Sequence, residues 1–288
     1  MIQLQNTKLK ATFNELGAEL VSLINLETGK EIIWEGNPDF WGGKSPVLFP
    51  TVGALKDDRY IFGGETYEMP RHGFARRRFF DVKSSTANEV VFELNSDEET
   101  LKFYPFDFSL EIKYTLTDNK LTVSYNVKNT SNKDMYFSLG AHPGFAIDTK
   151  NGLKYDDYEI GFSEDEKLEI HPLMDNLISK ETKTIDLENK TLPLSYGLFS
   201  KDALVMTTMK SKELILRNHK NNHKIVFTFS NFPYFGIWAA KNADFVCMEP
   251  WQGIADIEDH NQELTEKFGV LKLEISGEWR GEWAIEIE

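Results

Sequence analysis

Residues 108–127 read FSLEIKYTLTDNKLTVSYNV, with apolar and polar side chains alternating on both sides of a polar centre. The apolar positions are Phe108, Leu110, Ile112, Tyr114 and Leu116 in the first half, then Leu121, Val123, Tyr125 and Val127 in the second. A period of two places alternate side chains on opposite faces of a β-strand, so each half is typical of a strand with one buried face. The polar residues 117–120 between the halves favour a turn. The stretch therefore predicts a long antiparallel hairpin.

The same alternation recurs from one end of the chain to the other. A second hairpin is predicted from residues 213–216 to residues 225–229, across a polar turn at 218–223. Shorter alternating runs lie at residues 4–13, 90–94, 271–275 and 283–287, whereas helical periodicity is confined to short pieces near 97–102 and 261–267. We therefore predict an all-β fold, a large antiparallel β-sandwich with few short helices.

Length and composition bear on the domain organisation. The chain has 288 residues, a length that all-β sandwiches often reach as one domain. Hydrophobic residues make up 41% and aromatic residues 13%, enough for a sizeable core. No interior linker and no internal repeat interrupts the strand pattern. We expect residues 1–288 to form one domain.

Charge and cysteine content restrict the partners and the compartment. A formal net charge of −14 disfavours binding to nucleic acid and to anionic membrane surfaces. The single cysteine, Cys247, excludes an intramolecular disulfide and any multi-cysteine metal site, which favours a reducing compartment. The first residues lack the apolar core of a secretory signal, and no stretch is long and apolar enough to span a bilayer. We expect a cytoplasmic protein.

Three short segments place an ionisable side chain among glycine, proline and aromatic residues. They are RHGFAR at residues 71–76, GAHPGF at 140–145 and MEPW at 248–251. Taken singly, His72 can be a turn residue and His142 a core histidine bonded to backbone carbonyls. Glu249 follows a buried strand pattern, and a buried carboxylate needs a partner or a raised pKa. Irregular backbone of this kind often carries binding and catalytic residues.

Together these residues suit proton transfer to and from a neutral polyhydroxy substrate. A pyranose ring opens when a base removes the proton of the anomeric hydroxyl while an acid protonates the ring oxygen, and it closes on the other face after rotation about the C1–C2 bond. One carboxylate and two imidazoles can fill these roles, each proton transfer contributing about 10²–10⁴ in rate. Such chemistry requires no cofactor and no metal.

Other chemistries are less well supported. His72, His142 and Glu249 could form a metal triad, but no close ligand pair fixes two ligands locally. A glycosidase needs two carboxylates, and Asp202 could be the second, although its surroundings also fit a turn-forming residue. The chain has no Gly-x-Ser-x-Gly elbow, no phosphate-binding glycine-rich loop and no dinucleotide fingerprint.

The three segments, in this order and with FVCMEPW at residues 245–251, resemble the aldose 1-epimerase superfamily and its LacX-like branch. The resemblance extends from FNELGAEL at residues 13–20 to WQGIAD at 251–256. It implies a galactose mutarotase-like β-supersandwich, a cleft on one sheet and hexose substrates.

The resemblance also implies roles for five residues. His142 matches the family's general acid at the ring oxygen, and Glu249 matches its general base at the anomeric hydroxyl. His72 matches a substrate-positioning histidine, and Asp202 an aspartate that binds sugar hydroxyls. Arg76 matches an arginine that helps hold phosphate in phosphosugar-specific relatives, where a guanidinium fork is well suited.

The chain departs from the family pattern at one cation. Relatives often carry an arginine just before the Pro-x-x-Phe-Pro segment or after the following Val-Gly, where this chain has Lys44-Ser45 and Ala54. Lys44 and Lys56 are the nearest cations, and a lysine offers a point charge in place of a fork. Trp238 and Trp251 could present flat faces to a sugar ring or be buried core aromatics.

Three functions remain open at this point. The first, which we predict, is an aldose 1-epimerase that interconverts the α and β anomers of an aldohexose by general acid/base ring opening and closure. The second is a hexose-6-phosphate 1-epimerase, and the third is a sugar-binding or regulatory protein that has lost turnover. In each case the expected partner is a small-molecule sugar, and a homodimer is an open alternative to a monomer.

Overall fold

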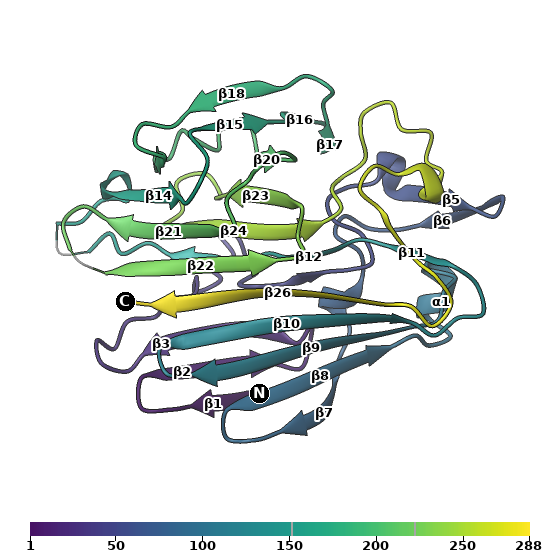
Figure 1. Ribbon diagram of the computed structural model, residues 1–288, viewed down its shortest axis with the longest axis horizontal. Helices are drawn as coiled ribbons and strands as arrows, with labels where there is room; N and C mark the ends of the chain where they lie inside the picture. Colours follow the sequence, from purple (N-terminus) through teal and green to yellow (C-terminus); the bar gives the residue numbers. More distant parts are fainter. Residues whose placement is uncertain (151, 222) are drawn as a thin grey trace.

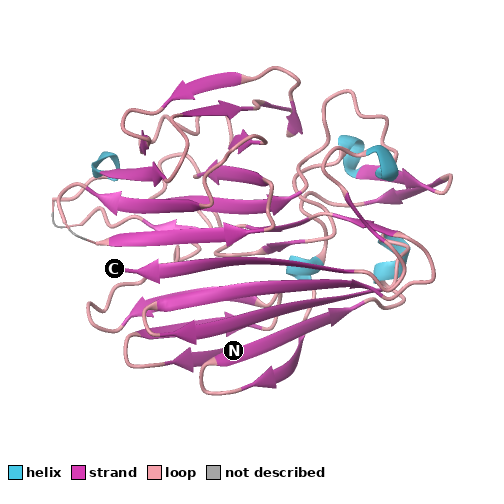
Figure 2. Ribbon diagram, viewed as in Figure 1, coloured by secondary structure: helices cyan, strands magenta, loops and turns pink. Residues whose placement is uncertain are grey.

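The computed structural model describes residues 1–150, 152–221 and 223–288, and its regular secondary structure is almost entirely β-strand (Figures 1 and 2). The strands pair antiparallel in two large sheets and several small ones. Helix is limited to short pieces, which are η1 (Lys56–Asp58), η2 (Ala75–Arg77), α1 (Thr100–Phe103), η3 (Tyr155–Asp157) and η4 (Leu264–Glu266). The predicted all-β antiparallel fold with few short helices is confirmed.

The larger sheet has nine strands in the order β19-β14-β21-β22-β26-β10-β9-β8-β7. Their bounds are β7 (Asp81–Ser85), β8 (Glu89–Asn95), β9 (Phe108–Thr117), β10 (Lys120–Asn129), β14 (Tyr158–Phe162), β19 (Thr191–Pro193), β21 (Glu213–Asn218), β22 (Lys224–Ser230) and β26 (Glu278–Ile287). Both predicted hairpins are present, because β9 pairs with β10 and β21 pairs with β22. Asn222, in the second predicted turn, lies outside the described residues. In Figure 1, β26 joins the two hairpins by lying between β22 and β10.

The smaller sheet has six strands, β20-β23-β24-β12-β4 with β13 also paired to β24. Their bounds are β4 (Val47–Leu48), β12 (Leu139–Ala141), β13 (Gly144–Ala146), β20 (Leu204–Met206), β23 (Tyr234–Trp238) and β24 (Phe245–Gln252). It packs on the larger sheet through aromatic rings. Phe145 lies 5.7 Å from Phe227 and Phe229 lies 4.8 Å from Phe235, measured between ring centroids. The core therefore lies between the two sheets, as in a sandwich.

The remaining strands form small sheets, and one of these also packs on the larger sheet through Phe13, whose ring centroid lies 4.4 Å from that of Tyr114. The strands of the small sheets are β1 (Ile2–Gln5), β2 (Leu9–Asn14), β3 (Glu19–Asn25), β5 (Arg59–Phe62), β6 (Glu65–Glu68), β11 (Met135–Phe137), β15 (Lys167–Ile170), β16 (Leu173–Met174), β17 (Leu177–Ile178), β18 (Lys183–Asp186) and β25 (Leu271–Leu273). The alternating run at residues 4–13 is divided between β1 and β2, because Asn6 Oδ1 accepts the N–H groups of Lys8 and Leu9 and turns the chain.

Membrane insertion through a helix has no support in the described part of the chain. Its helices are one turn long, and none combines the length and apolar character that a span requires.

Candidate active site

Strand β24 delivers Glu249 to a buried position beside the smaller sheet. Every residue of the strand is buried, and alternation places Glu249 and Trp251 on the face opposite Met248. On the neighbouring strand, Gly236 pairs with Glu249. A Cβ on Gly236 would come within 2.4 Å of the Trp251 ring, so glycine leaves the space that this indole occupies. The Glu249 residue is 1% exposed.

Around Glu249 is a cavity of about 260 Å³. Its lining residues are Trp41, Gly53, Arg71, His72, Arg76, His142, Leu173, Asn176, Ile178, Asp202, Ala203, Val205, Trp238, Glu249, Trp251 and Ala255. The structure thus brings together residues from all three motif segments and also Asp202 and Trp238, although they are widely separated in sequence.

His142 lies directly against Glu249. It follows β12 and precedes Pro143, and its Nε2 is 3.3 Å from Glu249 Oε2. The contact is not a hydrogen bond, and neither Glu249 Oε2 nor His142 Nδ1 has a hydrogen-bond partner among the described residues. Buried polar atoms are usually paired, so these atoms are available to a ligand.

Burial controls the protonation of this pair. It raises the pKa of the Glu249 carboxyl well above its usual value, an effect that the positive charge of Arg71 opposes. Burial also lowers the pKa of His142 to about 3, and the charges of Arg71 and Arg76 add to this lowering. Both directions favour the uncharged forms. At neutral pH the pair therefore holds one titratable proton, on the Glu249 carboxyl, and carries no net charge.

A tight turn sets the position of His72. His72 and Gly73 both have left-handed backbone conformations, with φ of 68° and 69°. A Cβ on Gly73 would stand 2.2 Å from the carbonyl oxygen of Phe49, so only glycine fits there. The Gly53 N–H donates to His72 Nδ1 at 3.1 Å, and the His72 N–H donates to the Gly53 carbonyl at 2.9 Å. Burial lowers the pKa of His72 as well.

Aromatic side chains surround the His142 ring. Trp41 contacts it in a tilted arrangement, with ring centroids 4.8 Å apart and an interplanar angle of 32°. Trp238 meets it edge-on at 5.7 Å and 78°. Trp251 is 6% exposed, lines the cavity and has an indole N–H without a partner among the described residues. Trp251 is therefore both a buried core residue and a residue that can face a sugar in the cavity.

Asp202 and Arg76 occupy the edge of the cavity. Asp202 has a positive φ of 86°, and its Oδ1 accepts the Ala203 N–H at 2.7 Å, so it is a turn residue that also lines the cavity. The Arg76 Nη2 donates to the Arg71 carbonyl at 2.9 Å. Its Nε is buried and has no partner within the described ranges, and burial lowers the pKa of this guanidinium.

The structure places Lys44 outside the cavity. Its Nζ donates to the Val21 carbonyl at 3.1 Å, and its backbone N–H donates to Glu19. Two arginines line the cavity, Arg76 as predicted and also Arg71, which was named within its sequence motif without being assigned a role. Trp41 and Asn176 were also missed. Arg71 could have been proposed as a site residue because it is adjacent to His72. Gly42-Gly43 after Trp41 was a weaker signal, and nothing in the sequence singles out Asn176.

A set of potential metal ligands differs from the predicted triad. His142, Cys247 and Glu249 each offer one ligand atom, and these atoms lie within 4.8 Å of one another. Burial raises the pKa of the Cys247 thiol, as it does for the Glu249 carboxyl. A metal ion needs both groups deprotonated. The set could hold an ion only by displacing these protons.

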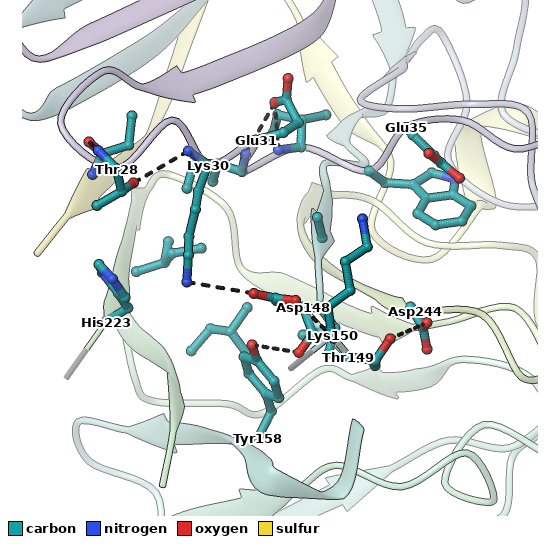
Figure 3. Close-up of a pocket in the computed structure, with 18 of the residues that line it drawn as sticks. Thr28, Lys30, Glu31, Glu35, Asp148, Thr149, Lys150, Tyr158, His223 and Asp244 are labelled. Atoms are coloured by element: carbon teal, nitrogen blue, oxygen red, sulfur yellow. Dashed lines mark hydrogen bonds and ion pairs between the residues drawn. The ribbon is translucent and has the colours of Figure 1, made fainter. Parts of the chain in front are cut away.

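A second cavity, shown in Figure 3, is larger, at about 500 Å³. Several of its polar side chains contact other groups of the lining. Lys30 Nζ lies 3.6 Å from Asp148 Oδ2, Thr149 Oγ1 donates to Asp244 at 2.7 Å, and Tyr158 donates to the Asp148 carbonyl at 3.2 Å. Its lining has no buried polar side-chain atom without a partner in the described part of the chain. Unpaired polar atoms indicate a ligand better than volume does, so we identify the smaller cavity as the candidate active site.

The chain is similar in sequence and fold to several known proteins. The family whose sequence pattern matches residues 1–272 is described as aldose 1-epimerase. The chain is 33% identical over 282 residues to the chromosomal protein LacX of Lactococcus lactis subsp. lactis, covering 94% of both chains. A galactose mutarotase related enzyme from Lactobacillus acidophilus superposes with a TM-score of 0.95 at 32% identity, over 100% of this chain and 97% of that one. A putative glucose-6-phosphate 1-epimerase of Escherichia coli K12 is 28% identical over 153 residues, 49% of each chain.

Proposed function

The chain belongs to the aldose 1-epimerase family, and we propose that it is an enzyme that interconverts the α and β anomers of an aldohexose. The fold, which is galactose mutarotase-like, supports this proposal. The observation that carries it is the buried pair of His142 Nε2 and Glu249 Oε2, 3.3 Å apart in the cavity. An acid and a base this close can act on one anomeric carbon at the same time, one at its hydroxyl oxygen and the other at the ring oxygen.

We assign Glu249 as the base at the anomeric hydroxyl and His142 as the acid at the ring oxygen. They act from the tautomer in which the one titratable proton of the pair has moved from the Glu249 carboxyl to His142, leaving a carboxylate beside an imidazolium. Ring opening moves one proton from the hydroxyl to Glu249 and one from His142 to the ring oxygen, while the bond between C1 and the ring oxygen breaks. After rotation about C1–C2, closure returns both protons. The ring-opened stage therefore coincides with the uncharged pair, the form that burial favours.

The size and lining of the cavity support a single sugar ring as the ligand. Its volume of about 260 Å³ lies below the range of roughly 300–1,000 Å³ typical of pockets for drug-sized molecules. His72 and Asp202 line it with polar groups that can bind hydroxyls, and Trp238 and Trp251 add aromatic faces.

A second candidate function, hexose-6-phosphate 1-epimerase, is favoured by one observation. Arg76 lines the cavity and has a buried Nε–H without a partner in the described residues. A guanidinium with a free donor suits a phosphate oxygen. The two candidate functions use the same acid and base. They differ in whether the sugar carries a phosphate group that Arg76 would bind.

Polarimetry tests the proposal. Freshly dissolved α-D-glucose, α-D-galactose and glucose 6-phosphate are followed to their equilibrium rotations, or by NMR for the phosphate, with and without the purified protein. We expect acceleration of at least one free hexose. Acceleration of the phosphosugar alone would favour the second candidate. Binding without any acceleration would contradict both and leave a sugar-binding protein.

A further inference from the structure

Both ring nitrogens of His72 lie within hydrogen-bond distance of an N–H donor, and a neutral imidazole cannot accept from both. Its Nδ1 is 3.1 Å from the Gly53 N–H donor, and its Nε2 is 3.3 Å from the Arg71 Nε–H donor. A neutral imidazole has one acceptor nitrogen and one N–H. Burial disfavours the doubly protonated ring by lowering the pKa of His72. One of these two nitrogens therefore carries the proton and faces another donor.

The backbone decides which nitrogen accepts. Gly53 and His72 are joined in both directions, since the His72 N–H also donates to the Gly53 carbonyl at 2.9 Å. A proton on Nδ1 would oppose the Gly53 N–H, which is a backbone group fixed by the paired Gly53–His72 hydrogen bonds, whereas Nε2 faces only a side-chain donor. The acceptor is therefore Nδ1, and the proton is on Nε2.

Arg71 and His72 then present two N–H donors to each other. Arg71 is held there from a distant part of the chain, because its Nη1 donates at 2.8 Å to Oδ1 of Asn176, 105 residues away. Asn176 lies at the tip of the β16–β17 hairpin, and the Ile178 N–H of that hairpin donates to the Asp256 carbonyl at 2.8 Å. Arg76 also binds the Arg71 carbonyl. The two donors are therefore held together by other contacts and not by their own attraction.

We propose that Arg71 Nε–H and His72 Nε2–H form a two-donor subsite that binds one oxygen atom of the sugar, and that Arg71 is a specificity-determining residue. The inference rests on the proposed function only in taking a sugar as the ligand. An oxygen acceptor placed between the two groups satisfies both donors. The acceptor is a hydroxyl oxygen of a neutral hexose or an anionic oxygen of a substituted one. Arg71 thereby supplies the cation that the sequence led us to expect from Lys44.

Calorimetric titration of sugars tests this subsite independently of turnover. D-glucose, D-galactose and glucose 6-phosphate are titrated into the parent, Arg71→Met, Arg71→Lys and Arg77→Met. We expect roughly 10- to 100-fold weaker binding of the preferred sugar to Arg71→Met, the range for losing a charged hydrogen bond. Arg71→Lys should recover only part of this loss, since an ammonium lacks the guanidinium geometry. Arg77→Met removes an exposed neighbouring arginine that does not line the cavity, and it should match the parent.

A panel of monodeoxy hexoses separates a direct contact from a structural effect. If the contacted oxygen is a hydroxyl, the parent should discriminate against one analogue, and Arg71→Met should bind that analogue and the full sugar alike. If it is a phosphate oxygen, the parent should prefer glucose 6-phosphate over glucose and Arg71→Met should lose that preference. Equal losses for every ligand would contradict the subsite.

The outcomes distinguish this inference from the proposed function. Parent affinity in a folded Arg71→Met variant would overturn the subsite even if mutarotation is fast. No detectable sugar binding by the parent would overturn it too. Sugar binding that depends on Arg71 without acceleration of mutarotation would remove the proposed function and leave the subsite standing.

Discussion

The two cavities differ in how their polar groups are satisfied. In the larger one, of about 500 Å³, Lys30 pairs with Asp148, and no described lining residue has a buried polar side-chain atom without a partner. The smaller one, of about 260 Å³, contains Arg76, His142, Glu249 and Trp251, each with a buried polar atom that has no partner among the described residues. Leaving such atoms unpaired costs about 1–3 kcal/mol each, so they persist where a ligand can use them.

The segment between Trp34 and Trp41 separates these two regions. Trp34 and Phe40 line the larger cavity, Trp41 lines the smaller one, and the Trp34 indole N–H donates to the Trp41 carbonyl at 2.8 Å. The cavities therefore share one loop, yet the buried pair of His142 and Glu249 belongs to the smaller cavity. Substitutions in the two cavities should therefore have very different effects on turnover.

The largest expected effect is that of Glu249→Gln on turnover. The amide keeps the shape of the carboxylate but cannot accept the hydroxyl proton, so we expect kcat to fall by about 10²–10⁴. Polarimetry of α-D-glucose and α-D-galactose measures the loss, with the parent and buffer as references. Turnover at the parent rate would show that Glu249 is not the base and would remove the main distinction between the cavities.

The same substitution should change the pH dependence of stability. Burial raises the pKa of Glu249 above its ordinary 4.5, so the folded protein retains a proton that the unfolded chain loses as the pH rises. The parent therefore loses stability relative to Glu249→Gln with increasing pH, by about 1.4 kcal/mol per pH unit between 4.5 and the raised pKa. Urea unfolding of both proteins over a pH series measures the difference. A constant difference would contradict the buried, protonated carboxyl.

A smaller effect is expected for Trp238→Leu. This substitution removes an aromatic face at the cavity but leaves His142 and Glu249 in place. Loss of an aromatic contact of about 0.5–1.5 kcal/mol should raise KM roughly threefold to tenfold. Initial rates at several hexose concentrations separate KM from kcat. A loss confined to kcat would instead indicate that Trp238 acts by positioning His142, whose ring it contacts.

The smallest effect is expected in the larger cavity. Lys30→Met breaks the Lys30–Asp148 pair, whose side chains are 41% and 33% exposed, and exposed pairs contribute about 0–1 kcal/mol. We expect mutarotation within about twofold of the parent and a stability change of about 0.5 kcal/mol or less. A large loss of activity would show that the larger cavity takes part in the reaction.

The sequence allowed the fold to be predicted where alternation was long and regular. The β9–β10 and β21–β22 hairpins follow from a period of two and a polar turn, both local properties. Glu249, His142 and His72 could be identified as candidate site residues from the sequence, because each lies beside glycine or proline in a short motif. These residues are close in space only because the strands of the smaller sheet and its connecting loops converge.

Other parts of the site depend on contacts between distant segments and could not be predicted. Asn176 reaches the cavity only because a separate hairpin folds over it, and its short polar turn has no distinguishing pattern. Lys44 was expected as a cation, but its ammonium instead binds the Val21 carbonyl. The protonation of His142 is likewise set by burial beneath Trp41 and Trp238, which no local motif encodes.

The central claim is that His142 and Glu249 of the smaller cavity interconvert anomers. It is tested most directly by NMR exchange between the α and β anomeric protons of glucose and galactose at equilibrium, with the parent, Glu249→Gln and Lys30→Met compared at equal concentration. We expect exchange well above the buffer rate with the parent and Lys30→Met, and near the buffer rate with Glu249→Gln. Exchange at the buffer rate with the parent, or equal acceleration by Glu249→Gln, would contradict the claim.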